Sequence, residues 1–310
     1  MDKAEALEKI LRRVRSVPLD PQKIFRIKSL GGSHKSKNVG HGFDFVQHAP
    51  FEDAEDERFI DWHVLARTGE KMIKRFRQES DIPIFILLDL TANMFLGTQL
   101  FFDFCTLKSE AALIVAAAFR ETALELRDPL GYLLVDSEGK NALFEPKKGL
   151  GSWAGLETAW SIIWEREKRQ DASGWPPTFL SALESLTSRL NRQMLLVIIS
   201  DFQETFSPEI MNRYLAALRR LENSHTLAVI AVRTPWEYAC PESRSPTFFR
   251  SGNSFLKFHA GSQRERELYN RITTGNREQL EVFFRGLAIP HAFLKTDDGI
   301  ISDLEKNLTI

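Results

Sequence analysis

Oxygen-bearing side chains follow an apolar run in the stretch FILLDLTANMFLG. Asp89 comes directly after the run, and Thr91 and Asn93 follow at every second position. A second apolar run, MLLVIIS, is followed by Asp201, and a loop containing glycine and proline leads to Thr178. A carboxylate, a hydroxyl and a carboxamide are hard oxygen donors, which suit Mg²⁺ or Mn²⁺. We therefore predict that these five side chains, from three separate segments, hold a divalent metal.

The same residues have a simpler interpretation. Asp89 and Asp201 can serve as N-caps of the helices that follow, with Thr91 and Asn93 as ordinary turn residues. However, two carboxylates that face each other in a dry crevice repel, and they usually need a cation or a shared proton. That requirement favours the metal hypothesis over the capping hypothesis.

The elements that would position these residues alternate between strand and helix. Unbroken apolar runs indicate strands covered on both faces, and they are separated by segments with helical periodicity. This pattern predicts an α/β fold with a doubly wound, mostly parallel sheet flanked by helices, in which ligands lie beyond the carboxyl ends of the strands. The expected strands are at 84–88, 131–135 and 194–200, near NALFE, and in HTLAVIAVR, FLKFH and HAFLK. The expected helices are at about 107–126, 156–167 and 178–190, after Pro208, before HAFLK and near Asp298.

An N-terminal extension precedes the sheet. Its first helix places Leu7, Ile10, Leu11 and Val14 on one face and is expected to end before Pro18. We predict two parts: residues 1–80, a helix and an extended segment that pack on the main domain, and residues 81–310, the main α/β domain.

A block within the extension alternates charged and apolar side chains. Its charged members, Arg58, Asp61 and Arg67, flank Trp62. We interpret the block as a structural clasp, in which Asp61 pairs with Arg58 or Arg67 in a partly buried ion pair. The alternative is a docking surface for a partner.

Composition excludes several classes of protein. The 310 residues include 41 basic and 42 acidic side chains, for a net charge of -1, which gives no overall attraction to nucleic acid or anionic lipid. Cys105 and Cys240 are far apart and lack a CxxC partner, which argues against a disulfide framework and favours a reducing cytoplasm. No stretch approaches the roughly 20 apolar residues that a membrane helix needs.

Two motifs resemble known families. The pattern D-x-T-x-N, followed by Thr178 and by S-D at Ser200 and Asp201, resembles the metal-ion-dependent adhesion site of von Willebrand factor A domains. The block PFEDAEDERFIDWHVLARTGEKMIKRF resembles the signature of a bacterial family, domain of unknown function fifty-eight. Asn93 stands where the adhesion motif usually has Ser, so a degenerate site with weak or no metal binding is an alternative.

The resemblance implies a function without turnover. It implies a von Willebrand factor A-like fold and a protein-interaction or adaptor module, acting with a MoxR-type AAA+ ATPase in the assembly or remodelling of other proteins. The alternative is a metal-dependent phosphatase or other hydrolase that uses Asp89. Phosphatases that present such an aspartate need a second one two residues later, where this chain has Thr91, so we expect a protein that is not an enzyme.

Overall fold

The computed structural model describes most of the chain. The described part consists of residues 3–15, 44–51, 60–77, 83–95, 107–136, 141–169, 178–190, 192–203, 208–238, 240, 246–251, 254–259 and 261–296. The chain divides into two compact units, one formed by residues 1–28 and 82–310 and the other by residues 29–81.

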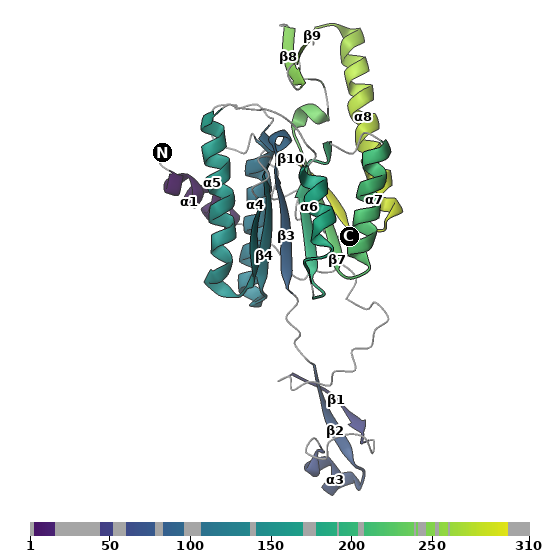
Figure 1. Cartoon of the computed structure of the whole chain (residues 1–310). Coiled ribbons are helices and arrows are strands. Elements are labelled where there is room, and N and C mark those ends of the chain that lie inside the picture. Colours follow the sequence, from purple (N-terminus) through teal and green to yellow (C-terminus); the bar gives the residue numbers. More distant parts are fainter. Residues whose placement is uncertain are drawn as a thin grey trace. The chain divides into compact units, whose positions relative to one another are not determined.

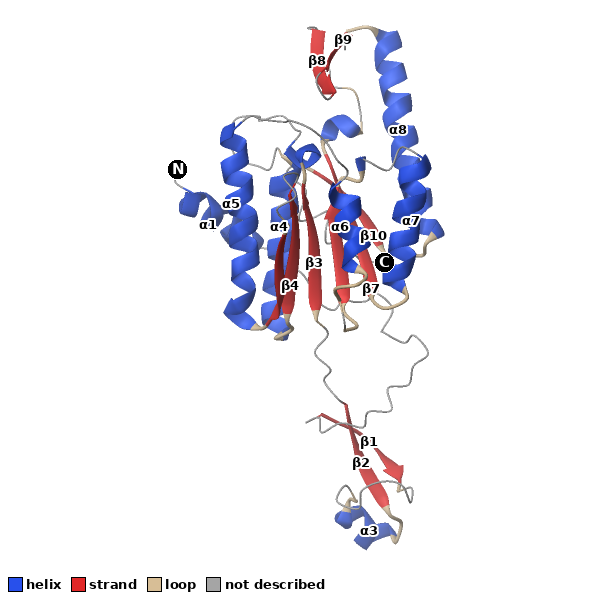
Figure 2. Ribbon diagram, in the orientation of Figure 1, coloured by secondary structure: helices blue, strands red, loops and turns tan. Residues whose placement is uncertain are grey.

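The larger unit contains a six-stranded, mostly parallel sheet (Figure 2). In spatial order the strands are β10 (His291–Lys295), β7 (Thr226–Arg233), β6 (Leu195–Ser200), β3 (Ile84–Leu90), β4 (Leu130–Asp136) and β5 (Ala142–Lys147). Only the edge pair β4–β5 is antiparallel among these strands. Renumbered along the chain, the order is 3-2-1-4-5-6, the doubly wound arrangement. The expected fold class, α/β with a doubly wound, mostly parallel sheet flanked by helices, is confirmed.

Helices cover both faces of this sheet (Figure 1). On one face, the core includes side chains of α1 (Lys3–Arg15), α4 (Lys108–Leu126) and α5 (Trp153–Arg169). On the other, it includes side chains of α6 (Thr178–Leu186), α7 (Pro208–Glu222) and α8 (Gln263–Gly286).

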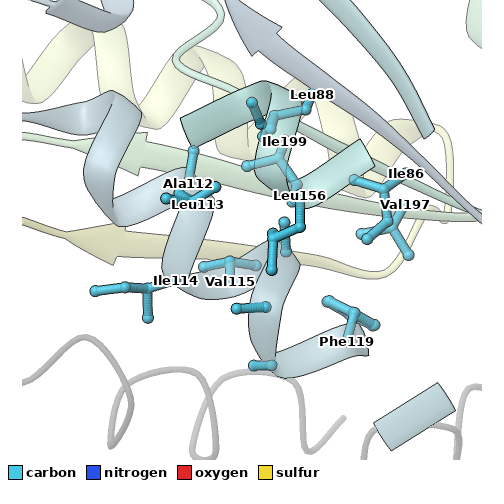
Figure 3. Packing of buried hydrophobic residues seen from close by; sticks show 14 of the residues in the cluster. Ile86, Leu88, Ala112, Leu113, Ile114, Val115, Phe119, Leu156, Val197 and Ile199 are labelled. Carbon is cyan, nitrogen blue, oxygen red and sulfur yellow. The ribbon is translucent and has the colours of Figure 1, made fainter. Parts of the chain in front are cut away.

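Strand β3 shows why both faces are covered. All seven of its residues are buried, and successive side chains alternate between the two cores. Ile86 and Leu88 pack with α4 on one side, together with Val197 and Ile199 of β6 (Figure 3). Phe85 belongs to the opposite core, and Asp89 follows the same alternation at the carboxyl end of the strand.

The first helix packs as its periodicity predicts. Leu7, Leu11 and Val14 of α1 are buried in the core against α4 and α5. The indole Nε1 of Trp160 in α5 donates to the carbonyl of Lys3 at 2.8 Å, and Lys3 Nζ donates to Ser161 Oγ at 2.6 Å. These contacts fix the start of the chain on the larger unit, although α1 is remote from the sheet in sequence.

The smaller unit is built on a hairpin of two strands. β1 (Asp44–Pro50) pairs antiparallel with β2 (Met72–Arg77), and the short helix α3 (Trp62–Thr68) lies between them in sequence. Ile60 and Ile73 form its buried core, with Phe51 packed against them. The basic run KMIKRFR therefore contains a strand.

Shorter elements complete the described chain. They are the 3₁₀ helices η2 (Ala92–Phe95), η3 (Gly149–Ser152) and η5 (Pro235–Glu237) and the antiparallel hairpin of β8 (Pro246–Ser251) with β9 (Ser254–His259). The helix expected near Asp298 lies outside the described residues. Within the described ranges, no helix has the length and apolar character to cross a membrane.

Candidate functional site

The carboxyl ends of β3 and β6 form the candidate site. These two strands are parallel neighbours, and the strand order reverses between them, so their ends mark the topological switch point of the sheet. Doubly wound sheets bind ligands at this point because the connections leave in opposite directions and open a crevice. Asp89 is the penultimate residue of β3, and Asp201 directly follows β6.

Asp89 is enclosed by hydrogen-bond donors from both strands. Its Oδ1 accepts from the backbone N–H of Thr91 at 2.9 Å, and its Oδ2 accepts from Ser200 Oγ at 2.6 Å. Burial, together with the nearby charge of Asp201, raises the pKa of Asp89 to about 7, although the bonds from Ser200 and Thr91 oppose the rise. At neutral pH this carboxyl group is therefore only partly ionised.

Asp201 makes the same local turn as Asp89. Its Oδ1 accepts from the backbone N–H of Gln203 at 3.1 Å, two residues on, as Asp89 does with Thr91. Phe202, between Asp201 and Gln203, has φ of 51°, a left-handed conformation that costs a residue with a side chain about 1 kcal/mol. The Phe202 ring is fully buried against three aromatic rings, of Phe179, Tyr214 and Phe284, which hold the turn in place.

A lysine ammonium group occupies the other side of Asp201. Lys108, the first residue of α4, donates from Nζ to Asp201 Oδ2 and to Glu237 Oε1, each at 2.9 Å. Lys108 is 2% exposed, so this is a buried charge. Burial alone would lower its pKa, but attraction to Asp201 and Glu237 outweighs burial and the pKa of Lys108 is raised. The lysine is therefore a permanent cation between two carboxylates.

The carboxylate of Glu237 accepts hydrogen bonds from four residues of the site. Its Oε1 accepts from Lys108, from Arg233 Nη1 at 3.1 Å and from the side-chain amide of Gln203, and its Oε2 accepts from Thr234 N at 2.6 Å. Burial alone would raise its pKa, but Lys108 and Arg233 outweigh burial and the pKa of Glu237 is lowered. Glu237 thus links the end of β7 to the end of β6 and the start of α4.

The charges of this network balance. Asp201 and Glu237 supply two negative charges, and Lys108 and Arg233 supply two positive charges. Lys108 lies in the first turn of α4, where the helix dipole disfavours a cation by about 0.3–1 kcal/mol. Two carboxylates at 2.9 Å more than offset this local penalty.

The residues predicted to bind metal are only partly described. Asp89, Thr91 and Asp201 lie together at the switch point, and Asn93 lies half-buried in η2. Thr178 begins α6, but its side chain lies outside the described residues. The capping alternative predicted that Asp89 caps the helix that follows it. The N-cap of α4 is Leu107, and Asp89 accepts a hydrogen bond from Thr91 N–H in the turn after β3.

The donor set at this edge does not suit a resident dication. Both oxygens of Asp89 and both oxygens of Asp201 already accept protein hydrogen bonds. A dication beside Asp201 would repel the Lys108 ammonium by about 8 kcal/mol, for a separation of about 4 Å and an effective dielectric constant of about 20. In the described part of the chain, no three His, Cys, Asp or Glu side chains are grouped to hold a metal ion.

Sequence reasoning missed Lys108, Arg233 and Glu237. Two signals were available: a lysine in the first turn of a mostly apolar helix, where the dipole disfavours it, and a third strand, β7, that also ends in polar residues. Neither signal gives the pairing, because Lys108 and Glu237 are 129 residues apart in sequence.

The described residues show part of the predicted clasp. Asp61 is the N-cap of α3, where its Oδ1 accepts from His63 N at 3.0 Å, and its Oδ2 lies 3.0 Å from His48 Nε2. Arg67 is exposed in the last turn of α3, and Arg58 lies outside the described residues. Trp62, the apolar side chain that these charged residues flank in sequence, is 63% exposed.

Solved structures with a similar arrangement include three from different organisms. The conserved hypothetical protein BatB of Bacteroides thetaiotaomicron has a TM-score of 0.39 at 11% identity, covering 74% of this chain and 97% of that one. A von Willebrand factor type A protein of Catenulispora acidiphila has a TM-score of 0.35 at 11% identity, covering 77% and 43%. Manganese-loaded TRAP protein of Plasmodium vivax has a TM-score of 0.29 at 18% identity, covering 49% and 57%.

Sequence relatives extend over most of the chain. Uncharacterized proteins of Mycobacterium bovis and Mycobacterium tuberculosis are 20% identical over 275 residues, which cover 89% of this chain and 81% of theirs. The family described as protein of unknown function DUF58 matches residues 49–279, more than half of the chain. The chain therefore belongs to the DUF58 family.

Proposed function

We propose that this chain is a non-catalytic protein-interaction module that docks a MoxR-type AAA+ ATPase in the cytoplasm and acts with it in the assembly or remodelling of other proteins. The observation that carries the proposal is the exposure of Trp62. This side chain is 63% exposed on α3, a seven-residue helix in which no residue is buried. An exposed tryptophan beside charged side chains is the composition of an interaction hot spot.

The local structure holds Trp62 in position without burying it. Asp61 caps the helix at one end, and Gly69, with φ of 76°, ends it at the other through a bond from its N–H to the carbonyl of Leu65 at 2.8 Å. A helix fixed at both ends presents its side chains with little further loss of entropy on binding. We therefore place the docking surface on the segment from Asp61 to Gly69.

The switch-point site supports a role without turnover. Lys108, Asp201 and Glu237 bind one another, and Asp89 is a poor nucleophile while it holds its proton. The alternative is a phosphatase or other hydrolase that uses Asp89. Turnover of p-nitrophenyl phosphate that is lost in Asp89→Asn would support that alternative.

The docking proposal is tested with purified proteins. The chain and the MoxR-type ATPase of the same organism are titrated by calorimetry with ATP or ADP. Trp62→Ala should weaken the interaction about 30-fold, the loss of a hot-spot residue worth about 2 kcal/mol. Leu143→Ala, which truncates a 40% exposed side chain on the edge strand β5, is the matched control and should leave the affinity unchanged. No binding with either nucleotide would contradict the proposal.

Metal dependence is a separate arm of the same titration. The sequence predicts Mg²⁺ or Mn²⁺ at Asp89, Thr91, Asn93, Thr178 and Asp201 as the adhesive, whereas Asp89 and Asp201 are each 2% exposed. The ADP titration is repeated without magnesium, either with EDTA or with added Mn²⁺. This distinguishes docking through a bound metal from docking through Trp62. If the ATPase fails to bind in EDTA and Mn²⁺ restores binding, the result would support metal-mediated docking instead of docking through Trp62.

A further inference from the structure

We propose that Lys108 is the cation of the switch-point site, so that a tethered ammonium group takes the place of a divalent metal and the wild-type edge binds no dication. This inference does not depend on the partner or on the Trp62 surface. It concerns what holds together the carboxylates of Asp201 and Glu237, which follow β6 and β7.

Geometry supports the assignment first. The ammonium lies 2.9 Å from oxygens of both Asp201 and Glu237, and these carboxylates follow the ends of two adjacent parallel strands, β6 and β7. Bridging carboxylates from separate strand ends is what a bound cation does at such an edge. Lys108 reaches them from the start of α4, a third element.

Charge balance supports it next. With Lys108 and Arg233 present, Asp201 and Glu237 are neutralised within the protein. Asp89, the remaining acid, has donors on both oxygens from Thr91 and Ser200. Among these described side chains, the three ion pairs leave no uncompensated carboxylate at Asp201 or Glu237 to attract a dication.

Burial explains why the lysine is required. Asp201 is 2% exposed, and a buried carboxylate that loses its partner is left uncompensated. Removing the ammonium but keeping the side-chain length should therefore leave a cavity edged by Asp201 and Glu237 that a small dication can enter. Wild type should therefore bind no dication, whereas Lys108→Met should bind one.

The test measures metal binding directly. Mn²⁺ is titrated into the full chain, and the free Mn²⁺ signal is followed by electron paramagnetic resonance. Thermal unfolding is measured in parallel with Mn²⁺ or EDTA. Wild type should bind no Mn²⁺ up to millimolar concentration, and its midpoint should be the same in both buffers. Lys108→Met should be less stable in EDTA, should bind Mn²⁺, and should gain about 2–4 °C in midpoint with a tenfold excess of Mn²⁺ over its dissociation constant.

A double variant provides the matched control. Lys108→Met with Asp201→Asn removes the negative charge together with the lysine, so it should recover stability in EDTA and lose Mn²⁺ binding. If Lys108→Met is unfolded in EDTA, refolding is attempted with and without Mn²⁺. Refolding that occurs only with Mn²⁺ supports the proposal. Mn²⁺ binding by wild type that Asp89→Asn abolishes would overturn it. Absence of Mn²⁺ binding, or of refolding with Mn²⁺, in Lys108→Met would overturn it as well.

Discussion

The hydroxyl of Ser200 lies 2.6 Å from Oδ2 of Asp89 and joins the two central strands where both of them end. The same hydroxyl oxygen accepts from the backbone N–H of Phe202 at 3.1 Å, so one side chain fixes both the carboxylate of β3 and the turn after β6. Ser200 is 1% exposed, which leaves water little access to replace either bond.

Ser200→Ala should therefore destabilise the protein by about 1–3 kcal/mol, because it leaves a buried acceptor and a buried donor without this partner. The bond from Ser200 opposes the raised pKa of Asp89, so its loss should cost more at pH 8 than at pH 5. Urea denaturation at both pH values measures this. Ser185→Ala, which removes a hydroxyl bonded to Ala182 O within α6, is the control. Equal losses at the two pH values would show that Ser200 does not stabilise the ionised carboxylate.

Asp89→Asn should change how stability depends on pH. Between pH 4 and 7 the unfolded chain releases the Asp89 proton while the folded chain keeps it, because the folded pKa is about 7 against 3.8. Wild-type stability therefore falls with rising pH through this window, by at most about 1.4 kcal/mol per pH unit from this group. The stability of Asp89→Asn relative to wild type should rise from pH 4 to 7 and then level off.

Chemical denaturation at pH 5, 6, 7 and 8 checks this prediction. Taking the difference between variant and wild type cancels the titration of other groups that the two share. Glu125→Gln, on an exposed position of α4, is the control for a surface carboxyl. A relative stability of Asp89→Asn that does not change with pH would mean that Asp89 ionises normally in the folded protein.

Glu237→Gln should be far more damaging than a surface substitution of the same kind. The neutral amide would leave Lys108 and Arg233 with one buried carboxylate fewer, at a cost of about 3–5 kcal/mol. Glu184→Gln is the matched control, because Glu184 pairs with Arg213 at 2.7 Å with both side chains more than a third exposed, and such pairs contribute about 0.2–1 kcal/mol. Urea denaturation at low salt and in 0.5 M NaCl distinguishes them, since salt screens the exposed pair much more than the buried network. A loss for Glu237→Gln as small as that for Glu184→Gln would refute the buried network.

The fold followed from the sequence where local pattern determines structure. The unbroken run from Ile84 to Leu88 and the run ending at Ser200 predicted the two central strands, since a strand covered on both faces must be apolar throughout. Alternation of strands with helices then placed Asp89 and Asp201 at one edge of a parallel sheet. The first helix was confirmed for the same reason, because its apolar residues repeat with helical spacing.

The remainder depends on tertiary contacts that local pattern does not encode. Lys108 looks like a solvated residue at the start of a helix, and only the fold brings it to Asp201 and Glu237. Strand β8 was not predicted, and α3 was read only as an alternating clasp, although Asp61 and Gly69 carry its capping signals.

Gly155 and Tyr132 provide the last prediction, on the packing of α5 against the sheet. A Cβ added at Gly155 would lie 2.3 Å from Cδ2 and 2.7 Å from Cγ of Tyr132, whose ring is fully buried in β4. The ring cannot swing into solvent, so Gly155→Ala should force the helix away from the strand and destabilise the protein by about 1–3 kcal/mol. Gly275→Ala in α8 is the matched control, because nothing lies within 4 Å of its added Cβ, and it should instead stabilise by about 0.5–1 kcal/mol through helix propensity. Thermal and urea unfolding measure both variants, and a neutral or stabilising Gly155→Ala would show that α5 does not approach β4 this closely.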